Sequence, residues 1–166
     1  MKHLDDDRLK HLAQVTADAL ARQYNRRYHS RIPVPLLLEF ELELTKPKVA
    51  GMAWTYPDIT AKGGLTIKTQ KIELKMTLFR DNPREFLNSV LPHEVAHLKQ
   101  RWDDVLNQAP SADHGYIWQI AMRAMNQVPK ATHSMDTSKA IAVYKERKAK
   151  TRKAKKDTHD TTSQLP

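Results

Sequence analysis

The sequence contains no cysteine, and this absence excludes several kinds of site. A disulfide framework, an iron–sulfur site, a zinc ribbon with Cys ligands and thiol chemistry are all ruled out. The chain also has no apolar run near the roughly 18 residues needed to span a membrane. Its first residues, MKHLDDDRLK, lack the apolar region of a signal peptide. We therefore expect a soluble cytoplasmic protein, and 166 residues with 40% hydrophobic content suit one domain with a real core.

Positive charge is concentrated near the end of the chain. Residues 139–156 contain nine basic residues and one acid, so they carry +8 of the net charge of +9. Such a segment is typical of an electrostatic arm for nucleic acid or another polyanion, and the alternative is a solubilising extension without a partner. We expect it to be flexible or partly helical after about residue 140. The predicted division is a domain over 1–137 and a basic tail over 138–166. The expected DNA contacts are Lys145, Arg147, Lys148, Lys150, Arg152, Lys153, Lys155 and Lys156.

The periodicity of apolar residues predicts an α+β domain. In chain order it predicts a helix over 5–28, strands over 38–44 and 49–56, a turn at 62–64, extended segments over 65–69 and 71–76, a helix over 83–102, a loop over 103–113 and a helix over 117–125. One helix thus precedes a small sheet, and two helices follow it.

The segment His93-Glu94-Val95-Ala96-His97 has the spacing of a metal site. Residues four apart lie on one face of a helix, about 6 Å apart along its axis. Two such imidazoles can bind one tetrahedral Zn²⁺ ion. Glu94 would then lie beside the open coordination position, where a carboxylate can accept a proton from water and pass it to a leaving amine. The alternative is a helix that has two histidines at this spacing by chance.

Catalytic zinc has three protein ligands, so a third ligand is needed. The first glutamate after Glu94 is Glu146 in the basic tail, which excludes a glutamate from a following helix. The next histidine is His114, at the start of a predicted helix that Trp118 would anchor. We favour His114 as the third ligand. The remaining candidates are Asp103, Asp104 and Asp113, of which the last is better suited to cap the helix.

These residues belong to a longer set of segments. They are Val90–Leu98 around the histidine motif, His114-Gly115 with Trp118, Val128-Pro129, Thr132-His133, Gly51–Trp54 and Ile72–Leu74. Together they resemble the SprT-like zinc metalloprotease family over residues 10–137. The resemblance implies a zincin-like minimal metalloprotease domain with one Zn²⁺ ion. It also implies proteolysis linked to DNA, because the related Spartan proteases of eukaryotes cut proteins crosslinked to DNA.

Two features depart from that family. Its members often end in a Cys-rich zinc ribbon, where this chain has the basic tail, and residues 98–113 are longer and more polar than in compact members. We predict a zinc-dependent endopeptidase that acts on protein or peptide substrates, including DNA-associated or DNA-crosslinked proteins. One alternative is a zinc-containing DNA-binding module with weak or no peptidase activity, which would not need Glu94. The other is a zinc hydrolase with a small-molecule substrate.

Overall fold

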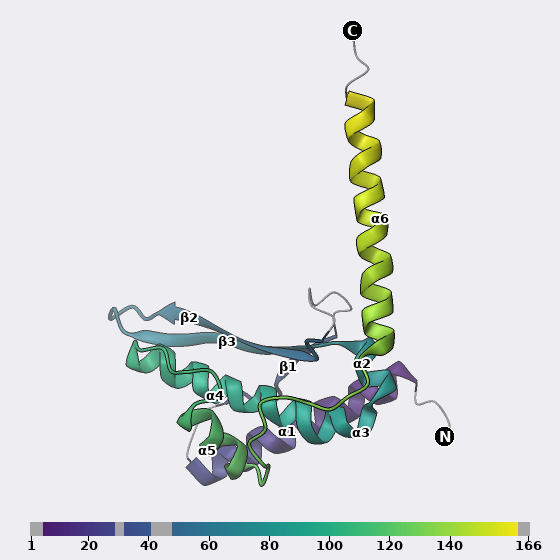
Figure 1. The fold of residues 1–166 in the computed structure, drawn as a ribbon. Helices are drawn as coiled ribbons and strands as arrows, with labels where there is room; N and C mark the ends of the chain where they lie inside the picture. Colours follow the sequence, from purple (N-terminus) through teal and green to yellow (C-terminus); the bar gives the residue numbers. More distant parts are fainter. Residues whose placement is uncertain (1–4, 29–31, 41–47, 163–166) are drawn as a thin grey trace.

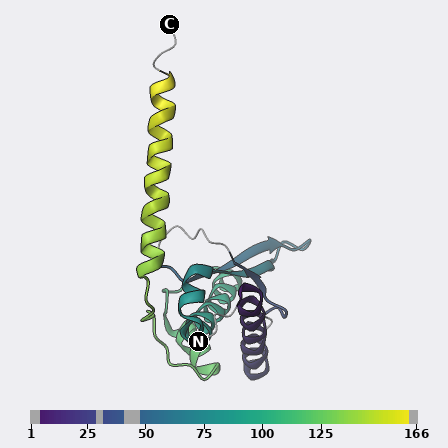
Figure 2. The same ribbon diagram turned by 90° about the vertical axis from the view of Figure 1, so that its right-hand side faces the viewer.

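Helices cover one face of a small β-sheet, and the last helix projects away from both (Figures 1 and 2). The computed structural model describes residues 5–28, 32–40 and 48–162, with side chains as far as residue 151. Within these ranges the architecture is α+β, as predicted. No helix of the described ranges is both long and apolar enough to cross a membrane.

Helix α1 (Asp6–Tyr28) confirms the first predicted element. The Asp5 carboxylate accepts a hydrogen bond from the backbone N–H of Arg8 at 2.7 Å, and this interaction caps the helix. The apolar positions recur at helical spacing and face the core. The buried apolar residues are Leu9, Ala13, Ala17, Leu20, Ala21 and Tyr24.

The sheet contains β1 (Leu37–Glu39), β2 (Gly51–Ile59) and β3 (Leu65–Leu74) in the order β1-β3-β2. Strand β1 is parallel to β3, and β2 is antiparallel to it. Gly63, with φ of +77°, forms the predicted turn between β2 and β3. The strand predicted over 38–44 is described only as β1, because residues 41–47 lie outside the described ranges. The two extended segments predicted after the turn form one strand that ends at Leu74.

Helix α2 (Met76–Asp81) occupies residues for which part of an extended segment was predicted. That prediction was wrong at Met76. The alternation of Ile72, Leu74 and Met76 is also compatible with a strand that ends at Leu74 and a helix that begins at Met76. Since Met76, Leu78 and Phe79 are buried on a helix of six residues, the helical period is too short to be seen in the sequence.

The predicted helix over 83–102 is continuous but not regular. It consists of α3 (Pro83–Glu85), one π-helical turn, η1 (Phe86–Val90), and α4 (Leu91–Asn107). The wide turn ends at Val90, two residues before Pro92, whose ring would clash with a carbonyl in a regular helix and which has no N–H to donate. The irregular turn therefore accommodates the proline immediately before the histidine motif.

The loop predicted over 103–113 was placed too early, because α4 continues to Asn107. The last turns of α4 are largely polar and partly exposed, and Lys99 and Asp103 form an ion pair one turn apart. Gln108, in the left-handed conformation with φ of 52°, ends the helix. The non-helical connection to α5 (Tyr116–Ala124) is thus only residues 108–115.

Helix α6 (Ser138–Thr162) contains the basic segment. The sequence predicts this segment to be either flexible or partly helical. The first turn of α6 contacts the rest of the fold: Ala140 is 5% exposed, and Lys139 Nζ lies 2.7 Å from Asp81 Oδ1 in α2. The remainder of the helix extends away from the sheet and the other helices (Figure 1).

Candidate metal centre

Three histidines meet between α4 and the start of α5. His93 and His97 come from successive turns of α4, and His114 comes from the connection before α5. The Nε2 atom of His93 lies 3.1 Å from that of His97 and 3.0 Å from that of His114, and the remaining pair is 3.2 Å apart. The structure thus brings together the three residues that the sequence singled out, and they form the one group of this kind found in the described part of the chain.

The chemistry of these three nitrogens fits a metal ion. Burial lowers the pKa of His93 to about 3, with His97 and His114 adding to the effect. Burial also lowers the pKa of His97 to about 4. Both rings are therefore neutral near pH 7 and can offer a lone pair. Three nitrogens bound to one zinc at about 2.0–2.1 Å with tetrahedral angles lie about 3.3–3.4 Å apart, close to the observed spacing.

The indole ring of Trp118 packs against all three imidazoles. Its side chain is 1% exposed, and its ring centroid lies 5.0, 5.9 and 4.7 Å from those of His93, His97 and His114. Its indole N–H also donates to the backbone carbonyl of His93 at 3.2 Å. The tryptophan predicted to anchor the helix therefore contacts the site itself.

The connection before α5 turns sharply at His114, whose φ is +58°. The next residue, Gly115, caps α5, and its N–H donates to the carbonyl of Ala112 at 2.9 Å. A Cβ at position 115 would lie 2.8 Å from that carbonyl oxygen, so the turn requires glycine. The sequence favours Asp113 as the cap of this helix, but the N-cap is Gly115. The Asp113 carboxylate instead lies 3.5 Å from the guanidinium group of Arg101.

The aspartates considered as alternative ligands lie outside the histidine cluster. Asp103 pairs with Lys99, and the Asp104 carboxylate accepts the N–H of Ser111 at 2.9 Å. Neither these two nor Asp113 belongs to the group of potential ligand atoms.

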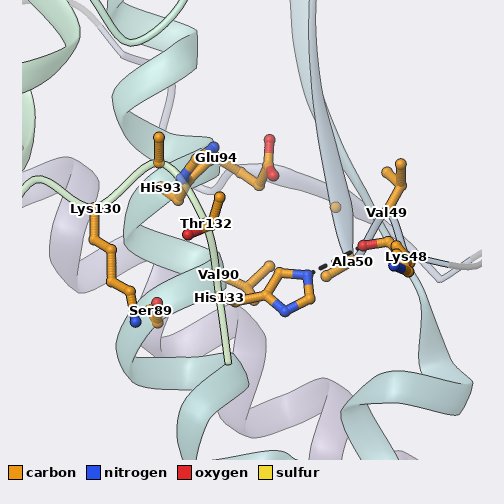
Figure 3. Close-up of a pocket in the computed structure, with 12 residues that line it drawn as sticks. Lys48, Val49, Ala50, Ser89, Val90, His93, Glu94, Lys130, Thr132 and His133 are labelled. Atoms are coloured by element: carbon orange, nitrogen blue, oxygen red, sulfur yellow. Dashed lines mark hydrogen bonds between the residues drawn. The ribbon is translucent and has the colours of Figure 1, made fainter. Parts of the chain in front are cut away.

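Glu94 extends from α4 toward the strand beside it (Figure 3). The residue is 6% exposed, and burial raises the pKa of its carboxyl to about 8, while a hydrogen bond from the backbone of Ala53 in β2 opposes this shift. A cation bound at the histidines would favour the carboxylate and lower this pKa. Gly51 makes the position possible, because a Cβ there would lie 2.8 Å from Glu94 Cγ. No local signal in the sequence indicated this contact, although Gly51 was part of the resembling segment.

A pocket of about 360 Å³ opens beside Glu94 and His93 (Figure 3). Its walls come from residues 48–51, which lead into β2, from η1 and α4, and from residues 130–133. His133, which the resemblance included without giving it a role, lines the pocket and donates from Nε2 to the carbonyl of Lys48 at 3.1 Å. Glu94 and His93 therefore both border an open pocket.

The basic residues predicted to contact DNA lie on α6, which projects away from α4 and α5 (Figure 1). Lys145, Lys148 and Lys150 are exposed, and Lys150 forms an ion pair with Glu146 at 2.8 Å. Arg147 lies on the same stretch. The side chains of Arg152, Lys153, Lys155 and Lys156 lie outside the described part of the structure.

Comparison with known proteins supports the resemblance seen in the sequence. A model of the SprT-like family matches residues 17–140. The chain is 35% identical over 78 residues to Protein SprT of Klebsiella pneumoniae subsp. pneumoniae, a match that covers 46% of this chain and 45% of that protein. It is 34% identical over 77 residues to Protein SprT of Vibrio atlanticus, covering 46% of this chain and 44% of that protein. The chain thus spans a little under half the length of the curated relatives it matches, and no solved structure is significantly similar to it. Because the family match extends over most of the sequence, the chain belongs to the SprT-like family.

Proposed function

We propose that this protein is a zinc-dependent endopeptidase with a zincin-like centre. His93, His97 and His114 would hold one Zn²⁺ ion, and Glu94 would be the catalytic acid–base residue. The observation that carries the proposal is the cluster of three imidazoles together with the buried Glu94 side chain, which lines the same open pocket as His93. A purely structural zinc site has four protein ligands and needs no such carboxylate.

Each part of the site has a definite role in peptide hydrolysis. When bound, Zn²⁺ supplies Lewis acidity, which acidifies water and polarises a peptide carbonyl group. The Glu94 carboxylate accepts the proton of the attacking water and returns it to the leaving amine. The backbone of Ala53 holds this carboxyl group, and Gly51 leaves it room. The pocket beside His93 accepts the polypeptide.

The proposed substrates include proteins associated with or crosslinked to DNA. In this arrangement residues 1–137 form the protease domain and residues 138–166 an arm that binds DNA. The basic residues of α6 support this proposal, because cations on an exposed helix can contact phosphates without sequence preference. The same helix supports a second candidate function, a zinc-containing DNA-binding module with weak or no peptidase activity.

The Glu94→Gln variant separates the two functions. The amide has the same size as the carboxyl group but cannot accept the proton, so we expect the rate of proteolysis to fall by about 10²–10⁴-fold. Zinc content and DNA affinity should stay at wild-type values. The measurements are cleavage of an unfolded protein substrate with and without DNA, and zinc analysis of both proteins.

Two outcomes would contradict the enzyme proposal. Cleavage by Glu94→Gln at the wild-type rate would remove Glu94 as the proton acceptor. Binding of zinc and DNA by a wild-type protein that cleaves no substrate would favour the binding module.

A further inference from the structure

Gln100 is a buried polar residue next to the histidine cluster. It lies on α4, one turn after His97, and its exposed fraction is 0%. A buried amide is costly unless its polar atoms are hydrogen-bonded. Gln100 meets this requirement through three hydrogen bonds. Each of them joins it to a proposed ligand or to the segment that carries one.

The orientation of the amide follows from its partners. The Nε2 atom of Gln100 lies 2.8 Å from the carbonyl oxygen of Ala112 and 3.0 Å from Oγ of Ser111. A backbone carbonyl can only accept, so the NH₂ group must face Ala112. The Oε1 atom then faces Nδ1 of His97, at 3.0 Å.

This orientation decides the tautomer of His97. The amide oxygen can only accept, so Nδ1 of His97 must carry the proton. In a neutral imidazole the lone pair is then on Nε2, the atom that faces the other two histidines. Without an acceptor at Nδ1 the ring could place its proton on Nε2, where it would block a metal ion.

The same side chain holds the connection that carries His114. The Ala112 carbonyl accepts both from Gln100 and from the N–H of Gly115. These bonds fix the chain immediately before His114, which has a left-handed backbone conformation that needs support from its surroundings. One buried amide thus links two of the three proposed ligands.

We propose that Gln100 is a positioning residue of the metal centre. It sets the tautomer and ring orientation of His97 and holds the segment from which His114 reaches the site. The inference rests on the proposed function, in which these histidines bind zinc. Partners of this kind typically contribute about 10- to 100-fold to metal affinity.

The test uses the full chain with two substitutions and a matched control. Gln100→Met keeps an unbranched side chain without hydrogen bonds, and Gln100→Glu keeps an acceptor for His97 but has no NH₂ group for Ala112. Gln23→Met is the control, because the Gln23 amide also donates to a backbone carbonyl, that of Ala124, away from the histidines. Zinc affinity is measured by competition with a chelator, and the histidine tautomers of the metal-free proteins are measured by ¹⁵N NMR.

We expect Gln100→Met to weaken zinc binding by about 10- to 100-fold, whereas Gln23→Met binds as the wild type does. His97 should be protonated at Nδ1 in the wild type and in Gln100→Glu, and should be a mixture of tautomers in Gln100→Met. Unchanged zinc affinity in Gln100→Met, or an unchanged His97 tautomer there, would overturn the proposal. If Gln100→Met does not fold, Gln100→Glu decides: a redistributed His97 tautomer overturns the proposal, and a retained one supports it. The tautomer measurement needs no metal, so a wild-type protein that binds no zinc would defeat the proposed function separately.

Discussion

The histidine cluster and helix α6 carry their functional side chains in opposite environments. Around the cluster, Glu94 is 6% exposed and Gln100 is fully buried, and each has defined partners on other elements. On α6, the paired side chains of Lys150 and Glu146 are 76% and 66% exposed. The first region therefore depends on the positions of individual atoms, while the second depends on the number of its charges and on the salt concentration.

The sharpest test of this difference is the replacement of a single proposed zinc ligand. His114→Ala should weaken zinc binding more than about 100-fold, because loss of a ligand exceeds the effect of its supporting partners. Asp103→Ala is the control, since this aspartate lies outside the cluster and pairs with Lys99. Chelator competition measures both variants. Loss of zinc in Asp103→Ala together with retention in His114→Ala would show that the assignment is wrong.

On α6 we expect no single residue to affect DNA affinity as strongly as His114 affects zinc binding. Replacing Lys145, Arg147, Lys148 and Lys150 together with glutamine should lower DNA affinity about 10- to 100-fold at low salt. The slope of log affinity against log salt should become shallower by up to about four, and zinc content should not change. Lys62→Gln with Lys68→Gln, on the β2–β3 hairpin, serves as the control. Equal slopes in the wild type and the fourfold variant would leave α6 as a solubilising extension.

The smallest expected effect comes from one added methyl group. In Gly51→Ala the new Cβ would lie 2.8 Å from Glu94 Cγ, so we expect the free energy of unfolding to fall by about 1–3 kcal/mol. Proteolysis should fall as well, because the carboxyl group must move. Denaturant unfolding measures the first effect. Adding Glu94→Ala to Gly51→Ala should relieve the clash, and a purely additive loss in the double variant would contradict the contact.

Predictions from the sequence succeeded where one element determines the outcome. Helix α1 has a long apolar period and a capping aspartate, so the local pattern defines it. Helix α2 and the end of α4 were misplaced for the opposite reason. The first has only six residues, and the polar last turns of the second resemble a loop until the tertiary structure shows them continuing to Asn107.

The candidate site divides in the same way. The sequence alone determined that His93 and His97 share one helix face, because the period of an α-helix fixes neighbours four residues apart. Only the tertiary structure decided that His114 folds back onto them, that Gly51 makes room for Glu94 and that Gln100 joins His97 to Ala112. These contacts join residues on different elements, or on a helix and the turn after it, and their distances depend on how the elements pack. A repeating local pattern carries no information about that packing.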